Sequence, residues 1–464
     1  MVFSSLVFLC IFLPIVFFGH LLLPGIRAKN AMLLAASLIF YAYGEPVYVL
    51  LLAASALLNY LWALGMERFA EKKKLLLACA VLMNVGLLAV FKYAGFLTET
   101  VNGLLGTALP VPQIRLPIGI SFFTFQAMSY VIDVYRGVNS AQKNFGKVLL
   151  YISFFPQLIA GPIVKYHDIE AEIENRSQTA EGVAKGIRRF IAGLSKKVLI
   201  ANVMAVAADA LFASDAGSLG AAAAWLGAVS YLFQIYFDFS GYSDMAIGLG
   251  WMFGFHFKEN FRYPYSSDSI REFWRRWHIS LSGWFLEYLY IPLGGNRKGR
   301  VRTCINKFIV FLCTGIWHGA NVTFLFWGIY HGCFLMLEEF VPWLRKKGGR
   351  IKQAGMHIYT LLVVCIGFVF FRADTMKQGF LWIKSMFTGF SVDNGSLSLC
   401  LQQLTPLYLV SFAAACVASF PVCERWRGRR GYETAATVCS MAGLVLCLLS
   451  LAGGTYNPFI YFRF

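Results

Sequence analysis

Residues 308–337 read FIVFLCTGIWHGANVTFLFWGIYHGCFLML, two apolar runs separated by His318, Gly319, Ala320 and Asn321. A helix needs roughly 20 mostly apolar residues to cross the hydrocarbon core of a bilayer, and these runs approach that length with their flanking residues. An ionisable side chain between two such runs is costly to bury in a membrane. The stretch therefore predicts membrane-embedded helix that is interrupted at a polar break carrying a histidine.

The rest of the chain repeats this apolar pattern. Of the 464 residues, 58% are hydrophobic and only 14% are charged, whereas soluble domains have about 25% charged residues. The composition predicts an all-helical, polytopic membrane protein rather than several soluble domains. The apolar runs lie at residues 2–23, 75–91, 198–212, 221–235, 308–317 with 322–337, 359–371, 407–422 and 435–451.

Positive charge is concentrated between the apolar runs. The formal net charge is +17, and the basic residues include Arg27, Lys29, Arg68, Lys72, Lys73, Lys74, Arg425, Arg427, Arg429 and Arg430. Basic loops next to membrane spans mark the cytoplasmic side. We therefore expect these loops in the cytoplasm and the N-terminus outside. The same placement favours a membrane partner over nucleic acid.

Cysteines and catalytic signatures narrow the function classes. The 11 cysteines are scattered, and none forms a CxxC pair, so we expect neither a metal site nor a disulfide framework. The chain contains no GxGxxG loop, Walker A motif, HExxH pair or GxSxG elbow. These absences weigh against redox, ATP-driven and serine-hydrolase chemistry.

Four segments predict local structure. Residues 31–66 are interrupted by Gly44, Glu45 and Pro46, which predicts a helical hairpin, and residues 98–115 predict a polar loop. Residues 182–198 place apolar and basic side chains on opposite sides, as an amphipathic helix on a cytoplasmic membrane surface does. Residues 258–302 are basic but rich in aromatic side chains, which favours an interfacial or re-entrant segment.

His318 is the first of two histidines in chemically suggestive settings among the seven of the chain. Gly315 and Gly319 flank it and would loosen the helix and let another backbone or a substrate approach closely. Asn321 supplies a polar partner near the break. Two interpretations stay open at this point: a catalytic histidine, or a neutral histidine that is hydrogen-bonded for packing.

His278 is the second. Ser269 and Glu272 fit a capping box, so a helix is predicted to begin there. Along that helix Arg271, Arg275, His278 and Ser282 would share one stripe. An amphipathic interface helix with its polar stripe toward lipid headgroups explains the pattern as well as a functional site does. We expect His20, His167 and His357 to be structural, and His256 is less easily assigned.

Two acids, Asp238 and Asp244, follow a long apolar run at residues 221–235. Acidic groups at such depth need partners, and the basic region at residues 258–300 is the nearest supply. We expect these acids to be structural anchors rather than acid–base groups.

Several long motifs can now be considered together. They are FDFSGYSDMAIG at 237–248, FWRRWHISLS at 273–282, YLYIPLGGNR at 288–297, GIWHGAN at 315–321, LPIGISFF at 116–123 and FPQLIAGP at 155–162. They resemble the membrane-bound O-acyltransferase family, in particular its alginate O-acetylation subgroup, over nearly the whole chain. Leu286 and Glu287 replace the usual Arg-Asp of the family, and Val322 stands where Trp often follows the Asn.

The resemblance implies specific roles and a specific architecture. It implies that His318 is catalytic, that His278 takes part in the chemistry, and that about 11 transmembrane helices with re-entrant and interfacial helices surround a central passage. Residues 1–464 would form one domain, with N-terminal spans at 1–135, a catalytic core at 136–340 and C-terminal spans at 341–464. Supporting or substrate-binding roles are expected for Asp238, Tyr242, Asp244, Arg275, Trp277, Ser282, Trp317 and Asn321.

The resemblance also implies a reaction. A cytoplasmic thioester, acetyl-CoA in the first instance, would be the donor substrate, with no resident cofactor or metal. His318 would take the proton of an acceptor hydroxyl, and His278 would orient a partner of His318, bind the acyl carbonyl or hold the acceptor. The acetyl group would leave at the outer face of the plasma membrane, where an esterase-like partner would pass it to a polysaccharide such as alginate or peptidoglycan. Transfer of D-alanine to teichoic acid is the alternative within the same superfamily. A polytopic transporter is the alternative from another class, but we find no inverted repeat.

Overall fold

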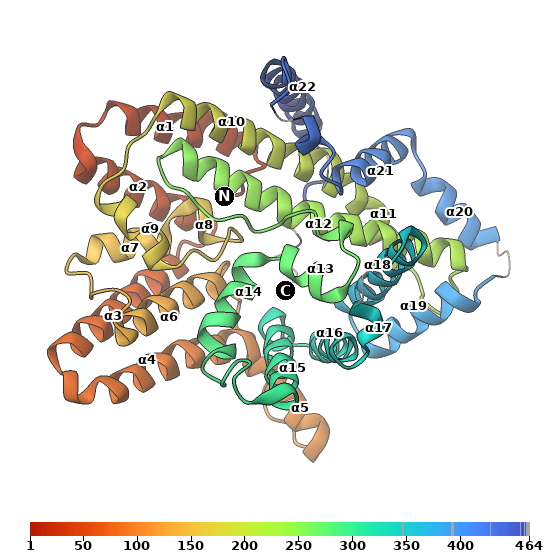
Figure 1. The fold of residues 1–464 in the computed structure, drawn as a ribbon, viewed down its shortest axis with the longest axis horizontal. Helices are drawn as coiled ribbons and strands as arrows, with labels where there is room; N and C mark the ends of the chain where they lie inside the picture. The colour runs from red at the N-terminus through yellow and green to blue at the C-terminus, as the bar shows by residue number, and fades with distance from the viewer. Residues whose placement is uncertain (346–347, 391–393, 427, 455, 459, 461–464) are drawn as a thin grey trace. The chain divides into compact units, whose positions relative to one another are not determined.

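The computed structural model describes residues 1–345, 348–390, 394–426, 428–454, 456–458 and 460. Within these residues the chain forms helices, turns and loops and no strand (Figure 1). The prediction of an all-α protein is confirmed. The chain divides into two compact units, Met1–Phe190 with Ser243–Lys258, and Ile191–Tyr242 with Glu259–Phe464.

The first unit is held together by phenylalanine side chains from distant parts of the sequence. Phe8 lies 5.9 Å from Phe40 and 6.4 Å from Phe155 between ring centroids, and Phe155 lies 5.8 Å from Phe253. Its elements are η1 (Phe8–Phe12), α1 (Leu13–Leu22), α2 (Gly25–Ala42), α3 (Tyr48–Arg68), η2 (Ala70–Lys72), α4 (Lys73–Leu88), η3 (Ala89–Tyr93), α5 (Ala94–Leu105), α6 (Ile120–Arg136), α7 (Phe145–Ser153), α8 (Phe155–Leu158) and α9 (Tyr166–Glu174). Helices α10 (Ala180–Ser195) and α12 (Ala221–Met252) contribute residues to both units.

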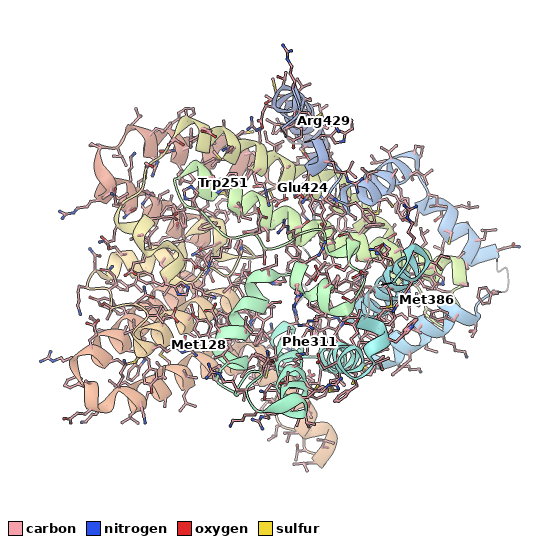
Figure 2. The ribbon with its side chains drawn as sticks, in the orientation of Figure 1. Met128, Trp251, Phe311, Met386, Glu424 and Arg429 are labelled. Carbon is pink, nitrogen blue, oxygen red and sulfur yellow. The ribbon has the colours of Figure 1, made fainter. Side chains whose placement is uncertain are left out.

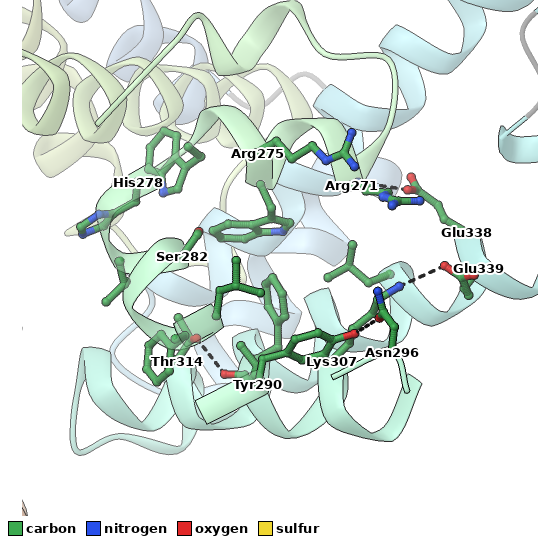
Figure 3. Close-up of a pocket in the computed structure, with 18 of the residues that line it drawn as sticks. Arg271, Arg275, His278, Ser282, Tyr290, Asn296, Lys307, Thr314, Glu338 and Glu339 are labelled. Carbon is green, nitrogen blue, oxygen red and sulfur yellow. Dashed lines mark hydrogen bonds and ion pairs between the residues drawn. The ribbon is translucent and has the colours of Figure 1, made fainter. Parts of the chain in front are cut away.

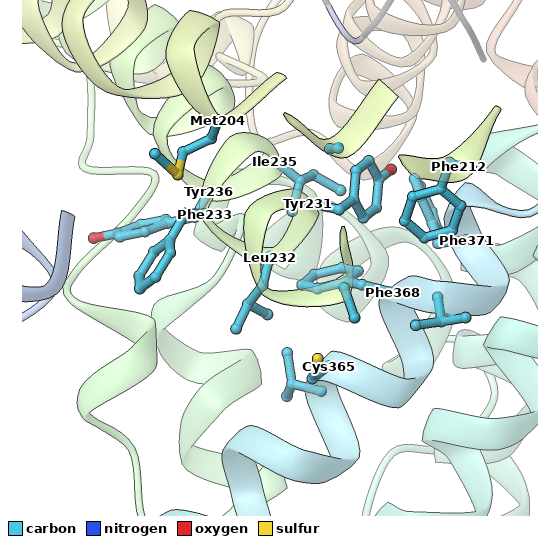
Figure 4. Close-up of a cluster of buried hydrophobic side chains, with 14 of the residues drawn as sticks. Met204, Phe212, Tyr231, Leu232, Phe233, Ile235, Tyr236, Cys365, Phe368 and Phe371 are labelled. Atoms are coloured by element: carbon cyan, nitrogen blue, oxygen red, sulfur yellow. The ribbon is translucent and has the colours of Figure 1, made fainter. Parts of the chain in front are cut away.

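The second unit buries one large apolar cluster between α12 and α18. Figure 4 shows Cys365, Phe368 and Phe371 of α18 among side chains of α12 that include Tyr231 and Leu232. The elements of this unit are η4 (Lys196–Ala201), α11 (Asn202–Phe212), η5 (Pro264–Ser266), α13 (Ile270–Arg276), α14 (Ile279–Phe285), η6 (Leu286–Tyr290), α15 (Gly299–His318), α16 (Val322–Phe340), α17 (Pro342–Arg345), α18 (Arg350–Arg372), α19 (Met376–Thr388), α20 (Asn394–Gln403), α21 (Pro406–Ala418), η7 (Cys423–Trp426) and α22 (Tyr432–Ala452).

Among the described residues, five helical stretches are long and apolar enough to cross a membrane. They are Tyr48–Arg68, Ala70–Leu105, Ala180–Phe212, Arg350–Arg372 and Tyr432–Ala452. Helices α20 and α21, bent by 72° at their junction, make a sixth if they form one broken span. The predicted number of about 11 transmembrane helices stays a prediction.

Two local predictions concern the segments at residues 31–66 and 98–115. The hairpin at 31–66 is confirmed, since α2 ends at Ala42 and α3 begins at Tyr48. The loop predicted at 98–115 is wrong in its first half, because α5 continues to Leu105.

The amphipathic surface helix predicted at 182–198 is wrong in its extent. Helix α10 continues through η4 into α11, and the joined stretch Ala180–Phe212 qualifies as a candidate span. Lys197, one of the basic residues of this segment, is buried in an ion pair with Asp238 of α12. The apolar residues that follow 198 are therefore part of the same helical stretch.

Candidate active site

The break that carries His318 is built by the ends of two helices. Helix α15 ends at His318, and α16 begins at Val322 after Asn321 accepts a hydrogen bond from the backbone N–H of Thr323 at 3.0 Å. The Asn321 amide also donates to the carbonyl of Asp374 at 2.9 Å. The sequence correctly predicts an interruption, and its polar residue serves as the cap of the second helix.

Glycines allow these two helices to touch. A Cβ atom at Gly328 would lie 2.5 Å from the carbonyl oxygen of Phe311, and one at Gly315 would collide with the carbonyl of Phe324. Gly315 is therefore a site of close backbone approach, as predicted, but it does not break α15. The close approach fixes where the end of α15, and with it His318, lies against α16.

His318 is half-buried among aromatic rings. Its ring centroid lies 5.0 Å from Trp317, 5.2 Å from Trp327 and 5.0 Å from Phe371, each close to edge-on. Such surroundings hold the imidazole in one place while leaving part of it accessible. This is the environment expected of a histidine that meets a substrate.

His278 lies at a sharp break in the chain. Helix α13 ends at Arg276, and His278 has the left-handed backbone angle φ of 46° before α14 begins at Ile279. A residue with a side chain rarely adopts this conformation, which costs about 1–3 kcal/mol and is typical of functional positions. The single helix predicted to run from Ser269 past His278 is therefore wrong, although its capped start is confirmed, since the Ser269 hydroxyl accepts from the N–H of Glu272.

Asn260 is the physical cause of that break. Its backbone carbonyl accepts from the N–H of Ile279 at 2.9 Å, and its side-chain oxygen accepts from the N–H and hydroxyl of Ser280 at 3.1 and 2.9 Å. These bonds replace those that a continuous helix would supply. The same side-chain oxygen lies 3.3 Å from Nδ1 of His278. His278 is 4% exposed, and burial lowers its pKa to about 3.

Both histidines line one cavity of about 410 Å³ within the second unit. Figure 3 shows His278 in this lining. The predicted residues Arg275, Trp277 and Ser282 line it as well. Arg271, Arg275, His278 and Ser282 therefore share one cavity, although they do not share one helix. The cavity is also lined by Trp274, Lys307, Phe311, Glu338 and Glu339.

The cavity has an apolar part and a polar part. Trp274 and Phe311, the second labelled in Figure 2, pack edge-on at 5.0 Å. Elsewhere in the lining, Lys307 pairs with Glu339 at 3.0 Å, and Glu338 accepts from the backbone N–H of Arg271 at 3.0 Å. The cavity can hold an apolar chain along one part and charged groups along another.

Trp317 connects the two histidines. Its ring centroid lies 6.3 Å from that of His278 and 5.0 Å from that of His318. Trp317 and Asn321 are not among the residues that line the cavity. The supporting roles of these two residues stay a prediction.

The two acids lie outside the cavity and have other partners than predicted. Lys197 lies 2.8 Å from Asp238, and Arg189 lies 2.6 Å from Asp244. The basic region at 258–300 does not supply these partners. The reason is a close helix contact, since a Cβ atom at Gly241 would lie 2.8 Å from the carbonyl oxygen of Gly193. The prediction of structural anchors fits this geometry, and Tyr242 is buried beside Gly241 on the same helix.

Four other histidines, none of which lines the cavity, have polar partners of their own. His167 lies 2.9 Å from Asp133, His256 lies 2.7 Å from Glu172, and Nδ1 of His357 lies 3.0 Å from the carbonyl oxygen of Ser267. His20 lies 3.4 Å from Arg176. No group of three or more His, Cys, Asp or Glu side chains within the described part of the chain is arranged to hold a metal ion.

Comparison with known proteins agrees with this geometry. The profile of the membrane-bound O-acyltransferase (MBOAT) family matches residues 134–373, which include His278 and His318. The chain is 41% identical to the probable alginate O-acetylase AlgI of Pseudomonas putida, with 100% of both chains aligned. The chain belongs to the membrane-bound O-acyltransferase family. This MBOAT protein is accordingly a membrane protein and an O-acyltransferase.

Other relatives show how the similarity is graded. The MBOAT chain is 36% identical to the peptidoglycan O-acetyltransferase of Helicobacter pylori, over 86% of this chain and 81% of that one. It is 27% identical to the teichoic acid D-alanyltransferase of Bacillus subtilis, over 55% of this chain and 68% of that one. Similarity is therefore greater to the relatives named for acetyl transfer. Membership of an enzyme family also removes the transporter alternative.

Proposed function

We propose that this MBOAT protein transfers an acetyl group from a cytoplasmic thioester to a hydroxyl group, for O-acetylation of a cell-surface or secreted polysaccharide. The observation that carries the proposal is that His318, at the end of α15, and His278, at the break between α13 and α14, line one cavity. The names of the relatives from Pseudomonas putida and Helicobacter pylori support acetyl as the group and alginate or peptidoglycan as the kind of acceptor. D-alanyl transfer is the weaker candidate, because the corresponding relative aligns over a smaller share at lower identity.

In the proposed reaction His318 is the general base. Its imidazole takes the proton of the acceptor hydroxyl while the hydroxyl oxygen attacks the carbonyl carbon of the thioester. The new C–O bond forms, the C–S bond breaks, and the leaving thiolate receives a proton from the imidazolium. The half-exposed position of His318 in the cavity supports this role.

His278 is suited to hold the acceptor hydroxyl. The Asn260 side-chain oxygen must be an acceptor, because it receives the backbone N–H of Ser280. Nδ1 of His278, which faces the same oxygen, therefore carries the proton, and Nε2 keeps a lone pair. A pKa of about 3 keeps this ring neutral at physiological pH. Nε2 can then accept a hydrogen bond from a hydroxyl, which favours acceptor binding over binding of the acyl carbonyl.

The donor is proposed to be acetyl-CoA or another acetyl thioester. A second, polar cavity of about 700 Å³ shares Arg271, Arg275 and Glu338 with the catalytic cavity, and Arg276 and Lys352 also line it. Its four cationic side chains outnumber its three acidic ones, Asp268, Glu272 and Glu338. This excess of positive charge supports binding of the phosphate groups of the donor while the acyl end reaches His318. No resident cofactor or metal takes part in this proposal.

The wider setting follows from charge and family. The chain is proposed to be a multi-pass protein of the plasma membrane, with residues 1–464 as one functional domain divided at 135 and 340 as predicted. The acetyl group is proposed to leave on the outer face, where an esterase-like partner transfers it to the polymer.

Gene deletion tests this function. Loss of the protein should remove O-linked acetyl from a surface polysaccharide and leave teichoic D-alanine unchanged. Loss of D-alanine with normal acetylation would instead assign the protein to D-alanyl transfer.

A further inference from the structure

A third histidine, His331, lies close to the catalytic cavity but is completely buried. It belongs to α16, one turn after Trp327, and the centroids of these two rings are 5.0 Å apart. Trp327 in turn lies 5.2 Å from His318. One indole ring therefore lies in contact with both the proposed base and this buried histidine.

His331 also contacts the wall of the cavity. Its ring centroid lies 5.0 Å from that of Trp274, edge-on, and Trp274 lines the cavity with His278 and His318. The two tryptophans that touch His331 thus belong to the immediate surroundings of the site. A change in the position of His331 would move both of them.

The side-chain nitrogens of His331, Trp274 and Trp327 have no hydrogen-bond partner within the described part of the chain. Neither ring nitrogen of His331 has a hydrogen-bond partner there, and the indole N–H groups of Trp274 and Trp327 have none. A buried polar group without a partner is destabilising, and an apolar side chain of similar shape would avoid that cost. Packing alone therefore does not account for a histidine at this position.

Helix α18 is shaped to accept this imidazole. A Cβ atom at Gly367 would lie 2.6 Å from Nε2 of His331. Phe371, one turn later on α18, lies 5.0 Å from His318. Residues of α16 and α18 therefore contact both His318 and His331. A glycine is required at position 367, where α18 meets His331.

We infer that His331 is a positioning residue for the acyl transfer. It sets the places of Trp327 and Trp274, and through Trp327 it sets the orientation of the His318 imidazole. Its ring nitrogens matter to the rate although they lower stability. The inference rests on the proposed function only for its rate readout.

Two matched sets of variants test this inference. His331→Leu should lower the maximal rate of acetyl transfer by roughly ten- to a hundredfold, because small misplacements of catalytic groups are costly. Its KM for acetyl-CoA should stay unchanged, and its melting temperature in detergent should be equal to or above that of the wild type. His331→Gln, which keeps a donor and an acceptor, should recover part of the rate. Gly367→Ala should also lower the rate, whereas Gly355→Ala on the same helix, which meets open space, should not.

The possible outcomes separate the explanations. A lower melting temperature for His331→Leu with a normal maximal rate would overturn the inference and make His331 a packing residue. Equal rates for Gly367→Ala and Gly355→Ala would also overturn it. If the wild type itself transfers no acetyl group, the proposed function fails. The melting temperature of His331→Leu then still tests the inference. A drop below the wild-type value would contradict the claim that the ring nitrogens of His331 lower stability.

Discussion

Nδ1 of His278 lies 3.3 Å from the side-chain oxygen of Asn260, the same oxygen that accepts the backbone N–H of Ser280. This contact joins the loop before α13 to the break after it. It gives the chain its left-handed turn at His278 and determines which ring nitrogen carries the proton. The position and the chemistry of His278 therefore have one common origin.

Replacement of Asn260 should impair the reaction through His278. We expect Asn260→Ala to lower acetyl transfer roughly five- to tenfold, because the hydrogen bond to Nδ1 of His278, worth about 1 kcal/mol, is lost together with the two bonds from Ser280, and the tautomer of His278 is no longer fixed. Ser280→Ala, which removes only the hydroxyl contact, should have a smaller effect. Initial rates at several acceptor concentrations measure this, and a rise in the acceptor KM is expected. Equal rates for both variants would contradict the role given to Asn260.

Stability should depend on pH through His278. Burial lowers the folded-state pKa of His278 to about 3, whereas an unfolded histidine has a pKa of about 6.5. Between these values the unfolded chain binds a proton that the folded chain does not, so stability is lost as pH falls below about 6.5. At pH 5 the loss is about 2 kcal/mol. The His278→Gln variant should lack this part of the pH dependence in detergent melting curves, and identical dependence in both proteins would refute the assignment.

The Lys197–Asp238 pair should be a structural anchor. The two side chains are 4% and 1% exposed, and Asp238 also accepts from the backbone N–H of Ile460 at 2.8 Å. Asp238→Asn leaves a buried ammonium without its counter-charge and should destabilise the protein by about 3–5 kcal/mol. The exposed pair Glu181–Lys185 provides the control, since Glu181→Gln should leave the melting temperature unchanged. A stable Asp238→Asn protein with abolished transfer would instead indicate an acid–base role.

Membrane orientation can be tested at the basic loops. We expect residues 72–74 and 425–430 in the cytoplasm, because local excess of Lys and Arg sets orientation. Arg427 lies outside the described residues. Cysteines placed at Lys73 or Arg429, in a chain whose exposed Cys10, Cys333, Cys423 and Cys439 have been replaced, should not react with an impermeant reagent in intact cells. Ready labelling from outside would reverse the predicted topology.

The sequence alone predicts much of the fold, because apolar runs and helix caps are local signals. The capped start at Ser269 and the interruption after His318 both follow from neighbouring residues. The break at His278 could not be predicted, because its cause is Asn260, 18 residues earlier, in a loop without any spacing signal.

Contacts between distant helices were also beyond the sequence. Lys197 meets Asp238 only because Gly241 lets two helices approach, and the nearer basic region appeared to be the better source of partners. His331 carried no signal for the same reason, since its importance depends on Trp274 and Trp327 in space.

Acetyl transfer by purified His318→Ala tests the central claim most directly. General-base catalysis contributes roughly 10²–10⁴-fold, so the variant should lose transfer by about that factor while it remains monodisperse in detergent. His256→Ala, at an exposed histidine outside the cavity, controls for the loss of an imidazole as such and should keep its activity. Appreciable transfer by a well-folded His318→Ala protein would contradict the account.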